Sequence, residues 1–447
     1  MSNIFFDFIE QKIAPVAGAF ASQRHIGAVR DGFIGAMPFM IVGSFLLVFA
    51  FPPFSPDTTF SFGQWWLAIS KEYFNQIMTP FNMTMGIMSC YISAGIAYNL
   101  ANHYKLDAFP TAMLSLMTFL LVAAPMEGGK LAGSYLGGTG IFTAIIVAIY
   151  VTELTRFLKV NNIGIKLPEQ VPPKIRESFD LLIPALVVIL TIYPLNLILQ
   201  GQFDMIMPQA IMSLFKPLIS ASDTLPAILL AVFVAHALWF AGIHGAAIVG
   251  GIMAPFWLVN LGLNQDALAA GVELPATFAE PLWSFFIVIG GSGATFALVL
   301  LYLRSKSVHL KALGKLCLVP SIFNINEPVI FGSPIVMNPV LFLPFVGVPM
   351  INATLAYIAI HTGMVGKIIS LVPWTAPAPI GAAWGAGWQV SNGLLVVGLI
   401  VLDLVLYYPF FKIYEKALLK QEAADLAESN STAQENTTEG GMQADPI

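Results

Sequence analysis

A single carboxylate in an apolar, helix-breaking stretch is the feature of this chain best suited to chemistry. Residues 321–338 read SIFNINEPVIFGSPIVMN and place Glu327 beside Asn324, Asn326 and Pro328. A charge at bilayer depth costs roughly 2.5–3.5 kcal/mol on insertion scales, so it is usually kept inside the protein or in a water-filled cavity. Asn and Pro interrupt a helix, which is tolerated at that depth where the freed backbone lines a cavity. Glu327 is therefore the first candidate for a functional group.

A second polar group lies in residues 238–251, LWFAGIHGAAIVGG. His244 stands between Gly242 and Gly245 at the junction of two apolar segments, where the backbone and the imidazole can both approach a ligand. A lone His is more often a structural residue with satisfied hydrogen bonds. Trp239 and the flanking glycines equally fit a ligand site, so both interpretations stay open for His244.

Tryptophan recurs among Pro and Gly in residues 372–388, VPWTAPAPIGAAWGAGW. Trp at a membrane boundary is most often an interfacial anchor. In a segment broken by Pro and Gly, the indole of Trp374 can instead form a flat apolar platform for the C–H face of a sugar.

The composition determines the class of the chain. Of 447 residues, 57% are hydrophobic and 10% charged, with a mean hydropathy of +0.79, whereas soluble domains carry about 25% charged residues. The basic residues lie in short loops, so the net charge of -5 gives no reason to expect nucleic acid as a partner. Cys90 and Cys317 have apolar neighbours and no metal-site spacing. We therefore expect an all-α multi-pass membrane protein without metal or cofactor and without a removable signal peptide.

Apolar runs of membrane-spanning length predict ten transmembrane helices. The candidate spans are 33–51, 77–100, 109–125, 138–158, 180–203, 224–242, 244–261, 281–303, 339–361 and 391–411. Loops 304–315 and 155–180 are basic and are predicted to be cytoplasmic, whereas 262–280 carries three acids without Lys or Arg, which suits the outside. Ten spans then place both termini in the cytoplasm.

Two further apolar segments, 316–338 and 364–389, fit this parity only as re-entrant hairpins shielded by surrounding helices. The alternative is that one of them is a true span and the count is wrong elsewhere.

The spans also suggest a division of the chain. Residues 1–30 include an amphipathic interfacial segment at 4–23, and 31–215 have few polar interruptions, as expected of a scaffold or dimer interface. Residues 216–415 hold the irregular segments and most buried polar residues, as expected of a substrate-binding transport domain. The acidic tail 416–447 is predicted to be disordered.

The order of these motifs resembles the membrane-embedded enzyme IIC component of the phosphoenolpyruvate-dependent sugar phosphotransferase system, in its lactose, cellobiose and diacetylchitobiose branch. The resemblance covers essentially the whole chain. It includes IGAVRDGFIGAMPF (26–39), KLPEQVP (166–172), GIHG (242–245), GGSGAT (290–295), INEPVIFGSPIVMNP (325–339) and Val372-Pro373-Trp374-Thr375. The aromatic segment reads VPWTAPAPIG where relatives tend to carry an APWTMP form, so the sugar preference stays open.

The resemblance implies a bacterial inner-membrane homodimer that moves a β-linked disaccharide inward while its 6-hydroxyl is phosphorylated. The donor is a phosphocysteine on a separate IIB protein, charged ultimately from phosphoenolpyruvate. Carried to this chain, the family roles make Glu327 the acceptor of the hydroxyl proton and His244 a ligand of the same hydroxyl. The predicted substrate-binding residues are Asn326, Asn324, Trp374, Trp239 and Gly245.

Two other classes fit part of the pattern. An intramembrane carboxylate, a His and broken helices also describe a proton-coupled secondary sugar transporter. A membrane scaffold can use polar residues merely to bind neighbouring helices. The chemical form of the accumulated sugar separates them, because only group translocation yields sugar phosphate.

The predicted orientation can be tested by labelling. If 304–315 faces the cytoplasm and 262–280 the outside, single cysteines at Ser307 and Ala270 react oppositely with an impermeant thiol reagent on intact cells. We expect the cysteine at position 270 to be labelled and the one at 307 to be protected. Equal labelling of the two positions contradicts the orientation.

Overall fold

The computed structural model describes residues 22–165, 181–333 and 338–440, together with positions 15, 19, 179, 335 and 336. Within these residues the chain is helical apart from one antiparallel β-hairpin. The elements up to residue 222 are α3 (Arg24–Ala50), α4 (Ser61–Glu72), α5 (Phe74–Asn82), η2 (Met85–Ile87), α6 (Met88–His103), α7 (Ala108–Ala123), β1 (Met126–Glu127), β2 (Lys130–Leu131), η3 (Gly138–Gly140), α8 (Ile141–Val160), α10 (Leu182–Phe203) and α11 (Met207–Ser222).

The remaining elements contain the predicted site residues. They are α12 (Leu225–Phe240), α13 (Gly245–Ala269), α14 (Glu280–Leu282), η4 (Trp283–Ile287), α15 (Phe296–Leu303), α16 (Val308–Ile322), α17 (Glu327–Gly332), α18 (Pro339–His361), α19 (Ala378–Gly385) and α20 (Val390–Gly440).

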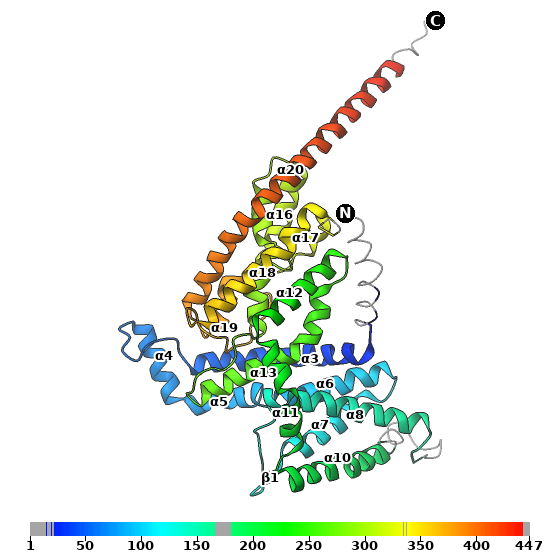
Figure 1. Cartoon of the computed structure of the whole chain (residues 1–447), viewed down its shortest axis with the longest axis vertical. Helices are drawn as coiled ribbons and strands as arrows, with labels where there is room; N and C mark the ends of the chain where they lie inside the picture. Colours follow the sequence, from blue (N-terminus) through cyan, green and yellow to red (C-terminus); the bar gives the residue numbers. More distant parts are fainter. Residues whose placement is uncertain are drawn as a thin grey trace.

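The helices form two groups with α13 between them (Figure 1). In the lower group α6 packs against α3, α7 and α8; in the upper group α18 packs against α12 and α20. Helix α13 contacts α3, η3 and α12 and so joins the groups. The contact with η3 requires glycine, because a Cβ on Gly262 would lie 2.8 Å from the Cα of Gly138.

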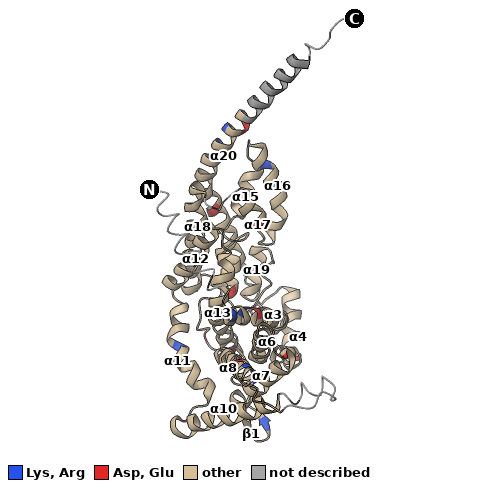
Figure 2. Ribbon diagram, turned by 90° about the vertical axis from the view of Figure 1, so that its right-hand side faces the viewer, with Lys and Arg blue, Asp and Glu red and all other residues tan. Residues whose placement is uncertain are grey.

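Six helices of the described chain are long and apolar enough to cross a membrane. They are Arg24–Ala50, Gly138–Val160, Leu182–Phe203, Gly245–Ala269, Pro339–His361 and Val390–Ala424, and each coincides with a span predicted from the sequence. Figure 2 shows long stretches of these helices without a charged residue. The described fold is thus that of an all-α multi-pass membrane protein.

The other predicted spans are shorter or broken. Span 109–125 corresponds to α7, and 224–242 to α12, which meets α11 at a 75° bend. Span 77–100 is interrupted between α5 and α6, and 281–303 between η4 and α15. The second break follows from glycine: Gly290, Gly291 and Gly293 all have positive φ, which ends a right-handed helix.

Segment 316–338 does form a helical hairpin, in which α16 and the short α17 contact each other. The loop predicted at 304–315 is shorter than expected, because Ser307 caps α16 by accepting a hydrogen bond from the Leu310 N–H at 3.2 Å. Ser307 is also buried. Lys311, exposed on the same helix, is therefore the better position for a labelling cysteine.

The tail predicted to be disordered from residue 416 is helical as far as Gly440, as the end of α20 (Figure 1). Ala, Glu, Gln and Leu are strong helix formers, and extending an existing helix needs no new nucleation. The predicted boundary at 215/216 falls inside α11, which packs against α7, α8 and α13. Most of the predicted amphipathic segment 4–23 lies outside the described residues.

Candidate functional site

Asn324 ties three separate segments together at the turn between α16 and α17. Its Oδ1 accepts a hydrogen bond from the Gly290 N–H at 2.9 Å. Its Nδ2 donates to the carbonyls of Trp374 at 2.7 Å and Ala376 at 2.9 Å. The residue adopts φ +60°, a left-handed conformation that Asn tolerates better than most side chains. Because both amide N–H bonds and Oδ1 are engaged, Asn324 holds backbone in place at this turn.

Asn326 holds the turn that follows η4. Its Nδ2 donates to the Ser292 carbonyl at 2.5 Å and to Thr295 Oγ1 at 2.8 Å. The fit is close, because a Cβ on Gly291 would lie 2.3 Å from the Asn326 Cγ. The Oδ1 of Asn326 accepts no hydrogen bond from the described residues, which leaves one acceptor for a ligand.

Glu327 is the first residue of α17, directly after the two asparagines. A carboxylate is favoured in the first turn of a helix, and Pro328 suits that turn because its missing N–H would have no partner there. The side chain is exposed, and no described residue forms a hydrogen bond or ion pair with it. The carboxylate is therefore accessible and is not packed among the helices.

His244 is the N-cap of α13 and is also exposed. Its Nδ1 accepts a hydrogen bond from the Ala247 N–H at 3.1 Å, so the ring proton is on Nε2, which can donate to a ligand. The ring lies 4.3 Å from the Trp239 ring, centroid to centroid. Trp239 is buried, and its indole N–H has no acceptor among the described residues.

Two predicted binding residues differ in their surroundings. A Cβ on Gly245 would lie 1.9 Å from the Ala235 carbonyl oxygen, so close packing of α13 on α12 is sufficient to explain this glycine. Trp374 is 46% exposed, and only its backbone is engaged, by Asn324. Its indole is available as a platform for a ligand.

The residues therefore form two groups. Asn324, Asn326, Glu327 and Trp374 are connected through the 290–295 turn, and His244 pairs with Trp239. The loop that carries His244 lies beside the chain that follows α17, since a Cβ on Gly242 would be 3.5 Å from Val336 Cγ1. No hydrogen bond between described residues joins His244 to Glu327.

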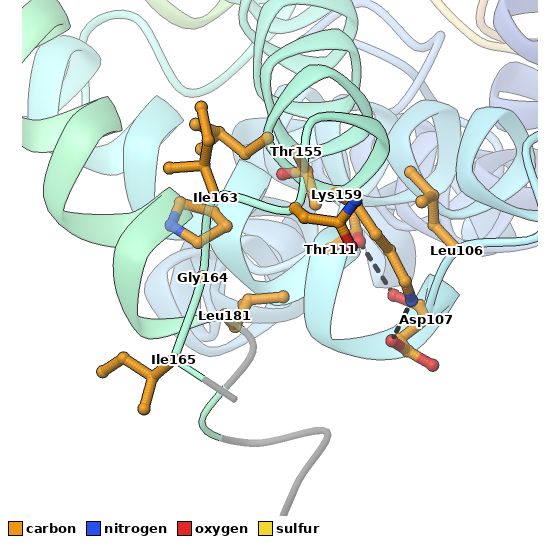
Figure 3. Close-up of a pocket in the computed structure, with 12 residues that line it drawn as sticks. Leu106, Asp107, Thr111, Thr155, Lys159, Ile163, Gly164, Ile165 and Leu181 are labelled. Carbon is orange, nitrogen blue, oxygen red and sulfur yellow. Dashed lines mark hydrogen bonds and ion pairs between the residues drawn. The ribbon is translucent and has the colours of Figure 1, made fainter. Parts of the chain in front are cut away.

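A separate pocket of about 230 Å³ lies between the start of α7, the end of α8 and residues 162–165 (Figure 3). Lys159 and Asp107 form an ion pair of 3.1 Å at its rim, and the Thr111 hydroxyl donates to the Asp107 carbonyl at 2.8 Å. None of the predicted site residues lines this pocket, whose described lining residues all lie between Leu106 and Pro184.

Asp403, on α20, is an intramembrane carboxylate that was not predicted as a functional residue. It is fully buried and accepts a hydrogen bond from Asn352 on α18 at 3.1 Å. The sequence did carry a signal for this residue, because Asp403 is the single acid within the predicted span 391–411.

The apolar helices, the broken helices and the polar residues at their breaks define a membrane transport protein. Residues 30–349 match the family described as phosphotransferase system, EIIC. The chain belongs to this family, and it is an integral, multi-pass protein of the bacterial inner membrane.

Individual relatives are similar over nearly their whole length. The lichenan permease IIC component of Bacillus subtilis is 39% identical, over 93% of this chain and 94% of the relative. The cellobiose-specific EIIC component of Geobacillus stearothermophilus is 38% identical, over 94% and 96%. The crystal structure of ChbC, the IIC component of the N,N'-diacetylchitobiose-specific system, superposes with a TM-score of 0.87 at 37% identity, covering 93% of this chain and 99% of ChbC.

His244 can serve as the cap of α13, through Nδ1, and as a donor to a ligand, through Nε2, and a pair of variants separates these two roles. His244→Asn keeps a favoured N-cap but loses the Nε2–H donor, whereas His244→Ala loses both. We expect the Asn variant to keep the wild-type melting temperature, and the Ala variant to lose about 1 kcal/mol of stability. Both should bind sugar about fivefold or more weakly, as measured by calorimetry. Wild-type affinity in His244→Asn would reduce His244 to a helix cap.

Proposed function

We propose that this chain, a sugar permease subunit, moves a β-linked disaccharide inward while a separate IIB protein phosphorylates the sugar's 6-hydroxyl. The observation that carries the proposal is an unpartnered, exposed carboxylate, Glu327, at a helix break held rigid by Asn324 and Asn326. Proteins named for lichenan, cellobiose and N,N'-diacetylchitobiose are similar along almost all of their length, and all three sugars are β-linked.

The proposed reaction balances in one step. The bond from phosphorus to the cysteine sulfur of IIB breaks as a bond to the sugar 6-oxygen forms. The hydroxyl proton passes to Glu327, and the IIB cysteine leaves as a thiolate. The Nε2–H of His244 donates to the same hydroxyl oxygen and orients it.

The sugar rings are held by the remaining groups. The exposed indole of Trp374 stacks on one ring, and Asn326 Oδ1 accepts from a hydroxyl. Trp239 packs against the His244 ring and completes the sugar site beside that imidazole. We propose positioning roles for Asn324, whose amide bonds three backbone groups, and for Gly245, where a Cβ would meet the Ala235 carbonyl.

The same proposal includes the assembly in the membrane. We propose ten spans and two re-entrant hairpins, on the basis of the apolar runs, with both termini cytoplasmic, on the basis of the loop charges. Helix α10 leaves Leu186, Leu190 and Leu197 about half exposed or more within one subunit, as suits a homodimer whose scaffold half, 31–215, meets its copy. Residues 216–415 then form the domain that moves the sugar.

Phosphorylated IIB needs a cytoplasmic docking surface. The exposed cations of the α15–α16 connection and α16 are Arg304, Lys306, Lys311 and Lys315. In Figure 2 α16 is among the few helices that show basic residues. We propose that this basic surface receives the IIB protein, since complementary charge steers association.

The role of Glu327 is tested by Glu327→Gln, which keeps the shape of the side chain but removes its capacity to accept a proton. Sugar binding should change modestly, while phosphorylation by phospho-IIB should fall about 10²–10⁴-fold. Both are measured on purified protein with labelled cellobiose, diacetylchitobiose and lactose.

Glu273→Gln serves as the matched control, because Glu273 has a 94% exposed side chain and lies in the predicted outer loop. It should phosphorylate sugar at the wild-type rate. Near-normal phosphorylation by Glu327→Gln would show that the carboxylate is not the base.

A further inference from the structure

Two buried oxygen atoms between α18 and α20 face the interior without a hydrogen-bond donor. Asn352 and Asp403 are each 0% exposed, and Asn352 Nδ2 donates to Asp403 Oδ2 at 3.1 Å. The second oxygen of each group, Oδ1 in both, is buried and accepts no hydrogen bond from the described residues. Leaving a buried acceptor without a donor costs free energy of folding. One additional proton, placed between the two Oδ1 atoms, would remove this cost.

No Lys, Arg or His among the described residues forms a hydrogen bond or ion pair with this carboxylate. Helices α15, α19 and η4, which pack against α20, contain no Asp, Glu, Lys, Arg or His. The titratable groups of α18 are Tyr357 and His361, five and nine residues beyond Asn352, and His361 lies within hydrogen-bond distance of Thr277. On α12, which packs against α18, the titratable group is His236, which contacts Phe345 and bonds the Val232 carbonyl. The nearby hydroxyls belong to Tyr302 and to Tyr407, which donates to the Gly293 carbonyl at 2.6 Å.

A proton on Asp403 Oδ1 changes the balance of donors and acceptors. The carboxylic acid then donates to Asn352 Oδ1 while Asn352 Nδ2 donates to Asp403 Oδ2. Acid and amide form a closed pair with two hydrogen bonds and no net charge. Burial of such a neutral, satisfied pair between membrane helices is far less costly than burial of an unpaired ion.

We propose that Asp403 is a permanently protonated carboxylic acid that clamps α18 to α20 and thereby positions the turn that carries the candidate site. Both helices reach the same residue of that turn. On α20, Tyr407 bonds the Gly293 carbonyl one helical turn after Asp403. On α18, the Phe345 ring fills the space beside Gly293, where a Cβ would lie 2.2 Å from the ring.

The clamp connects to Glu327 through the turn itself. Asn326, the residue before Glu327, bonds the Ser292 carbonyl and Thr295 beside Gly293. A shift of α18 against α20 therefore moves the support under Glu327. This positioning role rests on the proposed function of Glu327, whereas the protonation of Asp403 does not.

Two other functional roles are conceivable for Asp403, and both require its ionised form. In one, Asp403 releases and rebinds its proton to drive symport; in the other, a monovalent cation lies between the two orphaned oxygens. Asn cannot release a proton and carries no charge, so Asp403→Asn abolishes both functions. In a neutral clamp Asn is an acceptable substitute, because two amides form the same closed pair.

The experiment compares purified wild-type protein with Asp403→Asn by infrared difference spectroscopy and by phosphorylation with phospho-IIB. We expect a protonated-carboxyl stretch in the wild type that is absent from Asp403→Asn and persists from mildly acidic to mildly alkaline buffer. Asp403→Asn should phosphorylate sugar within about twofold of the wild type, with an unchanged pH profile and no response to Na⁺ or K⁺.

Asn352→Ala removes the partner and leaves an acid without an acceptor, so it should lower phosphorylation about tenfold. If this variant does not fold, the exchanged pair Asn352→Asp with Asp403→Asn replaces it and should restore activity. Glu327→Gln should keep the infrared band while losing phosphorylation, which separates this proposal from the catalytic one. A missing band in the wild type, cation-dependent activity, or a folded but inactive Asp403→Asn would overturn the clamp.

Discussion

In a membrane-embedded chain, every backbone N–H and C=O that a broken helix releases needs a partner inside the protein, because hydrocarbon supplies none. At the break between η4 and α15 these partners are side-chain amides. Asn324 accepts from the Gly290 N–H, and Asn326 donates to the Ser292 carbonyl. The same Asn324 satisfies two carbonyls near Trp374. Two asparagines separated by one residue thus allow three irregular segments to meet, and Glu327 directly follows the second of them.

This constraint explains the surrounding packing. Gly291 and Gly293 have positive φ, and each faces a side chain at a distance that admits no Cβ. The turn is fixed on one side by Asn326 and on the other by Phe345 and Tyr407. Glu327 itself is left exposed, with no hydrogen-bond or ion-pair partner among the described residues. A rigid support beneath an accessible carboxylate is the arrangement that a positioned general base requires.

Hydropathy predicts the long helices well, since each of the six apolar spans in the described chain coincides with a predicted one. A hydropathy window averages over the short breaks within a span. The interruption at Met83–Ile87 in span 77–100 and the one at Gly290–Gly293 in span 281–303 were therefore not expected. Composition likewise could not show that the acidic tail continues α20 to Gly440. The number of spans, derived from apolar runs, and their orientation, derived from loop charges, remain predictions.

The site residues were found because polar side chains in apolar runs are conspicuous, but their partners were not predictable. Asn324 bonds residues 34 to 52 positions away, and a single sequence carries no signal of such pairs. The separate roles of Asn324 and Asn326 therefore emerged only from the structure. Asp403 was overlooked for the same reason, as its partner Asn352 lies in another helix.

The central claim is that transport and phosphorylation are coupled, and it is tested most directly by the chemical form of the sugar inside proteoliposomes. Phospho-IIB is enclosed, labelled cellobiose is added outside, and the contents are separated by chromatography. The account predicts sugar 6-phosphate, formed only with phospho-IIB and insensitive to an uncoupler. Accumulation of free sugar that collapses with an uncoupler would contradict it and identify a proton-coupled transporter.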